Sequence, residues 1–212
     1  MNSGATSANK AAMARGAPKG CAKLDDANNE TRSGLASKSK DKKIVGPDKN
    51  GAGTTVASSS FTPARGGRSI NQTAHNNAKA NNFSQNALAE GSGGKSKVKC
   101  PAASHKYLKG MEAQHAGHAE ARMVDNVFTG RKPKGSMTIN VDWIPSTDPQ
   151  SKMPCENCLK LLCAAQKCGV DIYLCDKEGK KKKLQEGKHC PKDGPPGPQH
   201  HQALQKTMGE AK

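Results

Sequence analysis

The sequence predicts an α/β domain flanked by disordered segments. Between residues 116 and 184, segments with apolar residues at helical spacing alternate with segments in which apolar and polar residues alternate as in a strand. Only 33% of the 212 residues are hydrophobic and 3% are aromatic, too few for every part of the chain to join a core. One compact domain with unstructured flanks follows from these two observations.

The N-terminal half has weak structural signals. Residues 1–38 combine Ala, Gly, Ser, Asn and Lys with almost no large apolar side chain, so we expect a disordered basic arm there. We place the domain at 39–190. It begins with a weak hairpin at 43–60, where β-branched residues flank a turn-like segment. Residues 63–94 return to Asn, Gly, Ser and Ala, which indicates a low-complexity insertion.

The core of the domain is predicted at 95–185, where the elements are better marked. We expect helices and strands in alternation, with helices at 116–128 and 155–166 and strands at 136–144, 170–175 and 180–184. Pro154 precedes the second helix, at a position where a helix can begin. Residues 191–212 are rich in Pro, His and Lys and predict a disordered tail.

The chain is strongly basic. Lysine and arginine number 34 against 18 acidic residues, for a formal net charge of +16. This charge favours an anionic partner, with nucleic acid ahead of a membrane. No apolar run approaches the roughly 20 residues that span a bilayer, and the first residues lack the apolar stretch of a signal peptide. We expect no membrane partner, and a location in the cytoplasm or delivery into a target cell without a conventional signal peptide.

Two short motifs carry the chemistry. His118-Ala119-Glu120 begins the first core helix, and Pro154-Cys155-Glu156-Asn157-Cys158 begins the second. Cysteines at i and i+3 share one face of a helix start, where the helix dipole favours thiolates, and His118 completes three zinc ligands. Three ligands leave zinc a fourth position for water, and Glu120 is the candidate that accepts the proton of that water.

The other cysteines have a structural alternative. Eight cysteines are present, and four lie within the fourteen residues 155–168, where a ladder of disulfides on one helix is geometrically awkward. We therefore expect reduced thiols, with Cys163, Cys168 and Cys175 as small core side chains. A structural zinc site that uses Cys163 or Cys168 is disfavoured, because Cys163 points about 140° away from Cys158 on a helix.

Several further residues keep two interpretations. His115 is either a substrate contact or a solvent-facing histidine, and Trp143 either walls a pocket or packs in the core. Lys180–Lys183 either grip phosphates or form a solvated turn. The polar C-terminal part contains three histidines, His189, His200 and His201. We expect any metal binding by these histidines to be incidental.

The paired motifs, with a strand from Met137 to Ile144 between them, resemble the cytidine deaminase-like superfamily, whose signature is H-x-E followed by P-C-x-x-C. The small size and low-complexity N-terminal region are most similar to bacterial polymorphic-toxin deaminases. The specific match covers about residues 115–175. The resemblance implies a three-layer α/β/α fold with a mixed sheet, zinc bound by His118, Cys155 and Cys158, and Glu120 as the proton shuttle.

The expected activity is hydrolytic deamination of cytosine in nucleic acid, with single strands favoured because the base must be unstacked. A free cytidine or nucleotide deaminase, and adenine as the base, stay open as alternatives within the enzyme class. A zinc-stapled nucleic-acid-binding module without turnover is the alternative from another class. A toxin domain would also have an immunity protein as partner; the sequence does not determine the oligomeric state.

Overall fold

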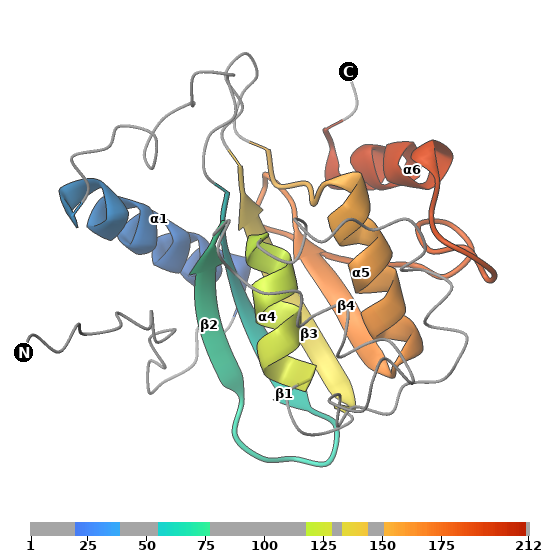
Figure 1. Cartoon of the computed structure of the whole chain (residues 1–212), viewed down its shortest axis with the longest axis horizontal. Helices are drawn as coiled ribbons and strands as arrows, with labels where there is room; N and C mark the ends of the chain where they lie inside the picture. Colours follow the sequence, from blue (N-terminus) through green and yellow to red (C-terminus); the bar gives the residue numbers. More distant parts are fainter. Residues whose placement is uncertain (1–19, 39–54, 77–117, 129–132, 144–150, 211–212) are drawn as a thin grey trace, which may run out of the picture.

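Figure 1 shows the computed structural model of the chain, in which helices surround one five-stranded mixed sheet. The structure describes residues 20–38, 55–76, 118–128, 133–143 and 151–210. In chain order the elements are α1 (Cys21–Lys38), β1 (Val56–Pro63), β2 (Ile70–His75), α4 (Ala119–Phe128), β3 (Gly135–Asp142), α5 (Glu156–Lys167), β4 (Val170–Cys175), β5 (Lys181–Lys183) and α6 (Pro198–Met208). The predicted α/β class is confirmed.

The strands of the sheet follow the order β2-β1-β3-β4-β5. β3 and β4 are parallel, and the other neighbouring pairs are antiparallel. Val56 at the start of β1 pairs with Asp142 at the end of β3 and with His75 at the end of β2. One end of the sheet therefore gathers the start of β1 with the ends of β2 and β3.

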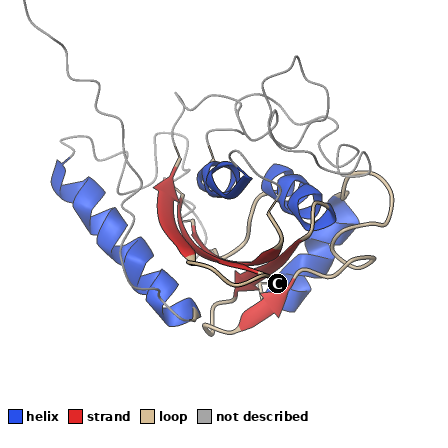
Figure 2. Cartoon of the chain, turned by 90° about the horizontal axis from the view of Figure 1, so that it is seen from below, coloured by secondary structure: helices blue, strands red, loops and turns tan. Residues whose placement is uncertain are grey.

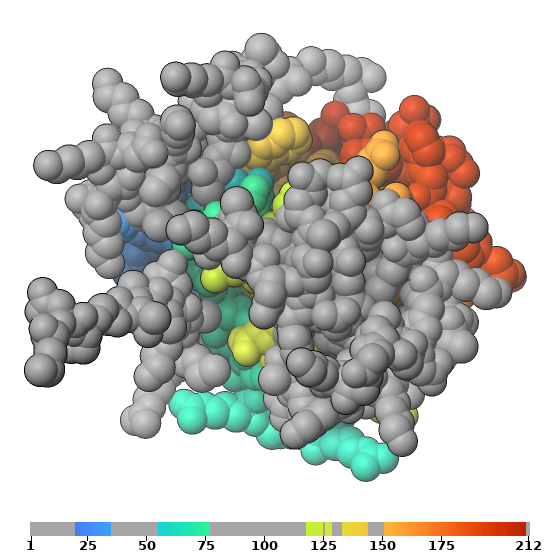
Figure 3. Space-filling model, in the orientation of Figure 1, coloured from blue at the N-terminus to red at the C-terminus, as the bar shows by residue number. Residues whose placement is uncertain are grey.

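Helices cover both faces of the sheet. α4 and α5 lie on its concave face, whereas α1 runs along the opposite face (Figure 2). α6 packs against α5. The C-terminal residues that include α6 are coloured red at the right-hand side of Figure 3. None of the described helices is long and apolar enough to span a bilayer.

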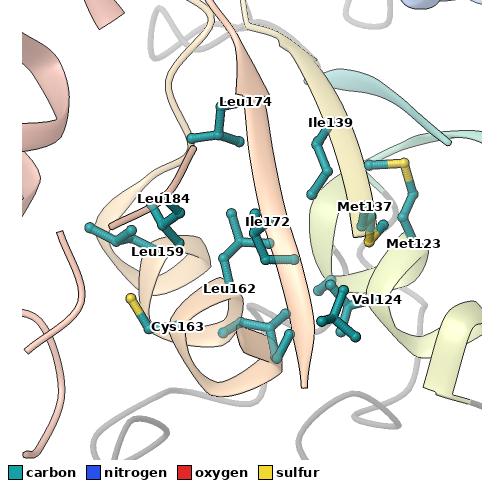
Figure 4. Packing of buried hydrophobic residues seen from close by; sticks show 14 of the residues in the cluster. Met123, Val124, Met137, Ile139, Leu159, Leu162, Cys163, Ile172, Leu174 and Leu184 are labelled. Carbon is teal, nitrogen blue, oxygen red and sulfur yellow. The ribbon is translucent and has the colours of Figure 1, made fainter. Parts of the chain in front are cut away.

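The apolar core lies between the concave face and the helices α4 and α5 (Figure 4). Alternate side chains of β3 and β4 enter it, because successive residues of a strand point to opposite faces of a sheet. The helices contribute side chains at helical spacing, which are fully buried. The core helices and strands expected between 116 and 184 are thus confirmed, with boundaries shifted by at most three residues.

Helix α1 corrects the expectation of a disordered arm at 1–38; residues 1–19 lie outside the described residues. It docks on the sheet mainly through polar groups. Asn28 Nδ2 donates to Asn140 O (3.0 Å), and the Arg32 guanidinium donates to the Asp142 carboxylate (2.8 and 3.0 Å). Leu24 is buried beside them. Hydrogen bonds of this kind replace the broad apolar stripe that a docked helix normally shows.

Two disulfides correct the expectation of reduced thiols. Cys21–Cys175 links α1 to β4 across 154 residues, and Cys163–Cys190 links α5 to the segment before α6. Cys168 is disulfide-bonded as well. Neither of the two described pairs lies within one helix, because their partners are 154 and 27 residues apart in the sequence. Of the described cysteines, Cys155 and Cys158 are free thiols.

The hairpin lies later in the sequence than predicted. β1 and β2 pair through residues 56–61 and 70–75, so most of the residues 63–76 that we assigned to a low-complexity insertion belong to the hairpin. The insertion from 77 to 94 and the first predicted strand near 43–45 lie outside the described residues. These strands were not predicted because they are rich in Ser, Thr and polar amide side chains. Their sequences therefore lack the alternation of apolar and polar residues that indicates a strand.

The prediction of a disordered tail at 191–212 is wrong for residues 198–208, which form helix α6. Pro198 occupies its first turn, Gly209 ends it in the left-handed conformation, and Leu204 and Met208 are buried in the core. His189 is also fully buried: Nδ1 accepts from the Gln185 amide (3.0 Å), and Nε2 hydrogen-bonds the Thr207 hydroxyl (2.9 Å). It belongs to the core rather than to a polar tail.

Candidate metal and active site

His118 lies where α4 begins, at the end of the sheet formed by the start of β1 and the end of β2. Its carbonyl accepts the first helical hydrogen bond from Arg122 N (3.1 Å). The next amide, Ala119 N, donates to Asn76 Oδ1 just after β2 (3.0 Å). A helix start leaves such amides without intrahelical partners, so Asn76 caps α4 and fixes its start against the sheet.

Cys155 and Cys158 occupy the start of α5. Cys155 is the N-cap residue, with extended backbone, and its Sγ accepts a hydrogen bond from the Cys158 amide (3.4 Å). Leu159 N donates to the Cys155 carbonyl (2.8 Å), which begins the helix. Pro154 therefore directly precedes the cap, and Cys158 is buried on the same side one turn later.

The two helix starts bring three ligand types together. His118 Nδ1 lies 3.3 Å from Cys158 Sγ and 3.5 Å from Cys155 Sγ, and the three ligand atoms lie within 4.8 Å of one another. Tetrahedral zinc with ordinary Zn–N and Zn–S bonds separates a nitrogen from a sulfur by about 3.5 Å. Among the described residues this is the group of histidine, cysteine and carboxylate side chains close enough to hold a metal ion.

The two thiols differ sharply in acidity. A side-chain hydrogen bond from the Cys158 thiol, together with one from His118, lowers the pKa of Cys155 to about 4 against the opposing effect of burial. The same hydrogen bond and burial hold the pKa of Cys158 well above its usual range. The hydrogen bond to Cys155 raises the pKa of His118. The lowered pKa of Cys155 favours the thiolate form that binds a metal, whereas Cys158 would have to release its proton when a metal binds.

Glu120 lies one residue into α4 and is only 2% exposed. Burial, reinforced by the negative charge on Cys155, raises the pKa of its carboxyl to about 7. A carboxyl with that pKa exchanges a proton readily near neutral pH. Glu120 is not part of the three-residue ligand group, so it is available for proton transfer rather than for metal coordination.

A cavity of about 240 Å³ adjoins these groups. His118, Glu120 and Cys155 line it together with residues that adjoin β1, β2 and β3, namely Thr55, Asn76 and Trp143, and with Met153, two residues before the N-cap of α5. Trp143 thus lies on the cavity wall and also packs, half-buried, against the apolar core, so both of its predicted interpretations apply. Sequence reasoning missed Thr55, Asn76 and Met153, since a single Thr, Asn or Met in a polar stretch has no distinguishing pattern.

The remaining candidates lie elsewhere. His115 is outside the described residues. The lysines at 180–183 pair with neighbouring groups: Lys180 with Glu178, Lys182 with Asp176, and Lys183 with Asp171, while Lys181 sits 4.5 Å above the Tyr173 ring. Lysines on an edge strand also discourage pairing with another chain, which gives them a structural role.

No family model, curated protein or solved structure matches the chain. The functional conclusion therefore depends on the site itself. The site offers three ligand atoms at metal-binding separations, a buried carboxyl that titrates near neutrality, and a cavity that two of the ligands and the carboxyl share. The ligand atoms and the carboxyl come from residues in the two motifs, whereas Thr55, Asn76, Trp143 and Met153 complete the cavity.

Proposed function

We propose that this chain is a zinc-dependent hydrolytic deaminase that acts on cytosine in nucleic acid. The observation that carries the proposal is the placement of Glu120 on the same cavity wall as His118 and Cys155, two members of the ligand group. A site that only held a metal would have no use for a buried carboxyl of raised pKa at this position. The conclusion also rests on the resemblance of the two motifs to deaminases.

The donor set favours zinc. Two sulfurs and one imidazole suit zinc, whereas magnesium and calcium take oxygen ligands. Structural zinc sites are closed by four protein ligands, and three protein ligands are the arrangement of catalytic sites. When bound, zinc lowers the pKa of a water ligand to about 7 and so supplies a nucleophile at neutral pH.

Glu120 would carry the protons. It would accept one proton from the attacking water and deliver it to ring N3 of cytosine as the water oxygen bonds to C4. It would then take the second proton, from the hydroxyl now on C4, and deliver it to the exocyclic amine, which leaves as ammonia as the bond from C4 to that amine breaks and the C4 carbonyl of uracil forms. Burial raises the pKa of Glu120 to about 7, which suits a residue that takes up and releases a proton twice in each turnover.

Charge and cavity size favour a base in a polymer. The chain carries a net charge of +16, which attracts a phosphate backbone. A cavity of about 240 Å³ walled by Trp143 and Met153 admits a base only after it has left its stack. Single-stranded nucleic acid presents such bases at lowest cost. Free cytidine, and adenine as the base, are the competing substrates within the enzyme class.

The test compares wild type with Glu120→Gln and with Glu156→Gln, a matched control on an exposed glutamate at the start of α5. Each protein is incubated with single-stranded DNA, duplex DNA, RNA and free cytidine. Deamination is read by sequencing or by released ammonia, and zinc content is measured alongside. We expect about one zinc per chain in all three proteins. Turnover should fall at least about 10²-fold in Glu120→Gln alone.

Each alternative has its own outcome. Deamination of cytidine but of no oligonucleotide would identify a free nucleoside as the substrate instead of a polymer. A-to-G changes would identify adenine as the base instead of cytosine. Stoichiometric zinc and nucleic-acid binding without wild-type turnover would identify a non-catalytic zinc module. Full activity in Glu120→Gln would refute the assigned proton role. Retention of zinc by the double variant Cys155→Ala, Cys158→Ala would refute the ligand assignment.

A further inference from the structure

The segment Ser151–Pro154 connects the cavity wall to the first cysteine. It leads directly into Cys155, and its Met153 lines the cavity. At its start it pairs with the residue after β3: Trp143 N donates to Ser151 O (3.0 Å), and Ser151 N donates to Trp143 O (2.7 Å). A shift of this segment would move the cysteine sulfur and both apolar walls of the cavity together.

The C-terminal segment holds this connection through Glu210. Its Oε2 accepts from the Ser151 hydroxyl (2.6 Å), and its Oε1 accepts from the Lys152 amide (2.6 Å). Ser151 Oγ in turn accepts from the Met153 amide (3.1 Å), so the carboxylate fixes the orientation of the hydroxyl that holds Met153. Hydrogen bonds to a carboxylate are short and roughly twice as strong as those between neutral groups.

His201 of α6 provides a second contact. Its Nε2 donates to the Pro154 carbonyl (3.0 Å), one peptide before the N-cap of α5. Glu210 and His201 belong to one unit, because Glu210 N donates to Gln205 O (2.9 Å) at the end of α6. Leu204 and Met208 anchor this unit in the core. The contacts on Ser151–Pro154 therefore come from a helix that is itself fixed.

We propose that Glu210 and His201 are positioning residues for the metal site. They act through Ser151–Pro154 and set where Cys155 Sγ and the side chain of Met153 lie, without touching either a metal or a substrate. The expected change in metal affinity requires only that His118, Cys155 and Cys158 bind the metal. The consequence for turnover rests on the proposed function.

The test uses the full chain with Glu210→Ala, Glu210→Gln and His201→Ala, beside Gln202→Ala as the control on an exposed face of α6. Zinc affinity is measured by competition with a chelator. Cobalt is substituted to follow the thiolate-to-metal absorption band, and thermal melting reports the fold. We expect zinc affinity to fall roughly tenfold in Glu210→Ala, as for other residues that orient metal ligands. The cobalt band should shift in Glu210→Ala and His201→Ala.

The variant Glu210→Gln keeps the shape and one acceptor but places an NH₂ group against a donor, so its cobalt band should shift while its melting stays near wild type. Some of the Glu210 and His201 variants should melt at the wild-type temperature. If these variants have the same zinc affinity and cobalt spectrum as Gln202→Ala, the inference is overturned. Wild type that binds zinc without deaminating would instead overturn the proposed function alone. Wild type that binds no metal would overturn both.

Discussion

Loss of the Cys21–Cys175 disulfide should destabilise the protein more than loss of Cys163–Cys190. Cross-linking a chain lowers the entropy of its unfolded state by an amount that grows with the logarithm of the closed loop. Separations of 154 and 27 residues give upper values of about 5 and about 3.5 kcal/mol at 25 °C. All four cysteines are at most 3% exposed, so the packing cost of replacing sulfur by hydrogen is similar in the two pairs.

The assay is urea unfolding of the double variants Cys21→Ala, Cys175→Ala and Cys163→Ala, Cys190→Ala, both with zinc present. The free energy of unfolding should fall in both, and by about 1.5 kcal/mol more in the first. Equal losses, or a larger loss in the second, would refute the loop-entropy reasoning. An unchanged midpoint in the first would show that Asn28, Arg32 and their polar contacts hold α1 without help.

Three other positions give sharp expectations. Gly135→Ala should lower the free energy of unfolding, measured by thermal melting, by at least about 2 kcal/mol, because φ is +156° and a Cβ would lie 2.1 Å from Thr62 O. Gly179→Ala, at φ +73° with no atom within 4 Å of the added Cβ, should lower it by only about 1 kcal/mol. Burial lowers the pKa of His189 from 6.5 to about 4, so the unfolded state binds more protons between these values. The contribution of His189 to stability should therefore be complete above pH 6.5 and fall by up to about 3 kcal/mol towards pH 4, measured in urea titrations as the pH dependence of the difference between wild type and His189→Ala. Gln72→Ala should cost about 1–3 kcal/mol by urea unfolding, since Gln72 Nε2 donates to the buried carbonyl of Met123 in α4 (2.8 Å), whereas an exposed Gln202→Ala should be neutral.

The elements that carry the motifs could be predicted because they use ordinary apolar patterning. In β3 and β4 alternate residues enter the core, and α5 buries every residue from Cys158 to Ala165 except Lys160. The ligand group could be predicted as well, since i and i+3 at a helix start places two sulfurs on one side whatever the rest of the fold does. The structure brings His118 to them, at 3.3 and 3.5 Å.

Helices α1 and α6 could not be predicted for physical reasons. Leu24 is the large apolar side chain of α1 seen to be buried, and what docks the helix is Asn28, Arg32 and a disulfide to a residue 154 positions away. None of these leaves a periodic signal. In α6, Leu204 and Met208 supply one turn of apolar spacing among His, Gln and Lys. Composition alone then favours disorder, although the long-range contacts favour a helix.

The disulfides restrict where the chain can mature. Disulfides form and persist in oxidising compartments and are rare where glutathione and thioredoxin keep thiols reduced. In an oxidising compartment, Cys155 and Cys158 face the same oxidants as the cysteines that pair, and Cys155 is already a partly exposed thiolate. A metal ion and an oxidant therefore compete for the same two sulfurs.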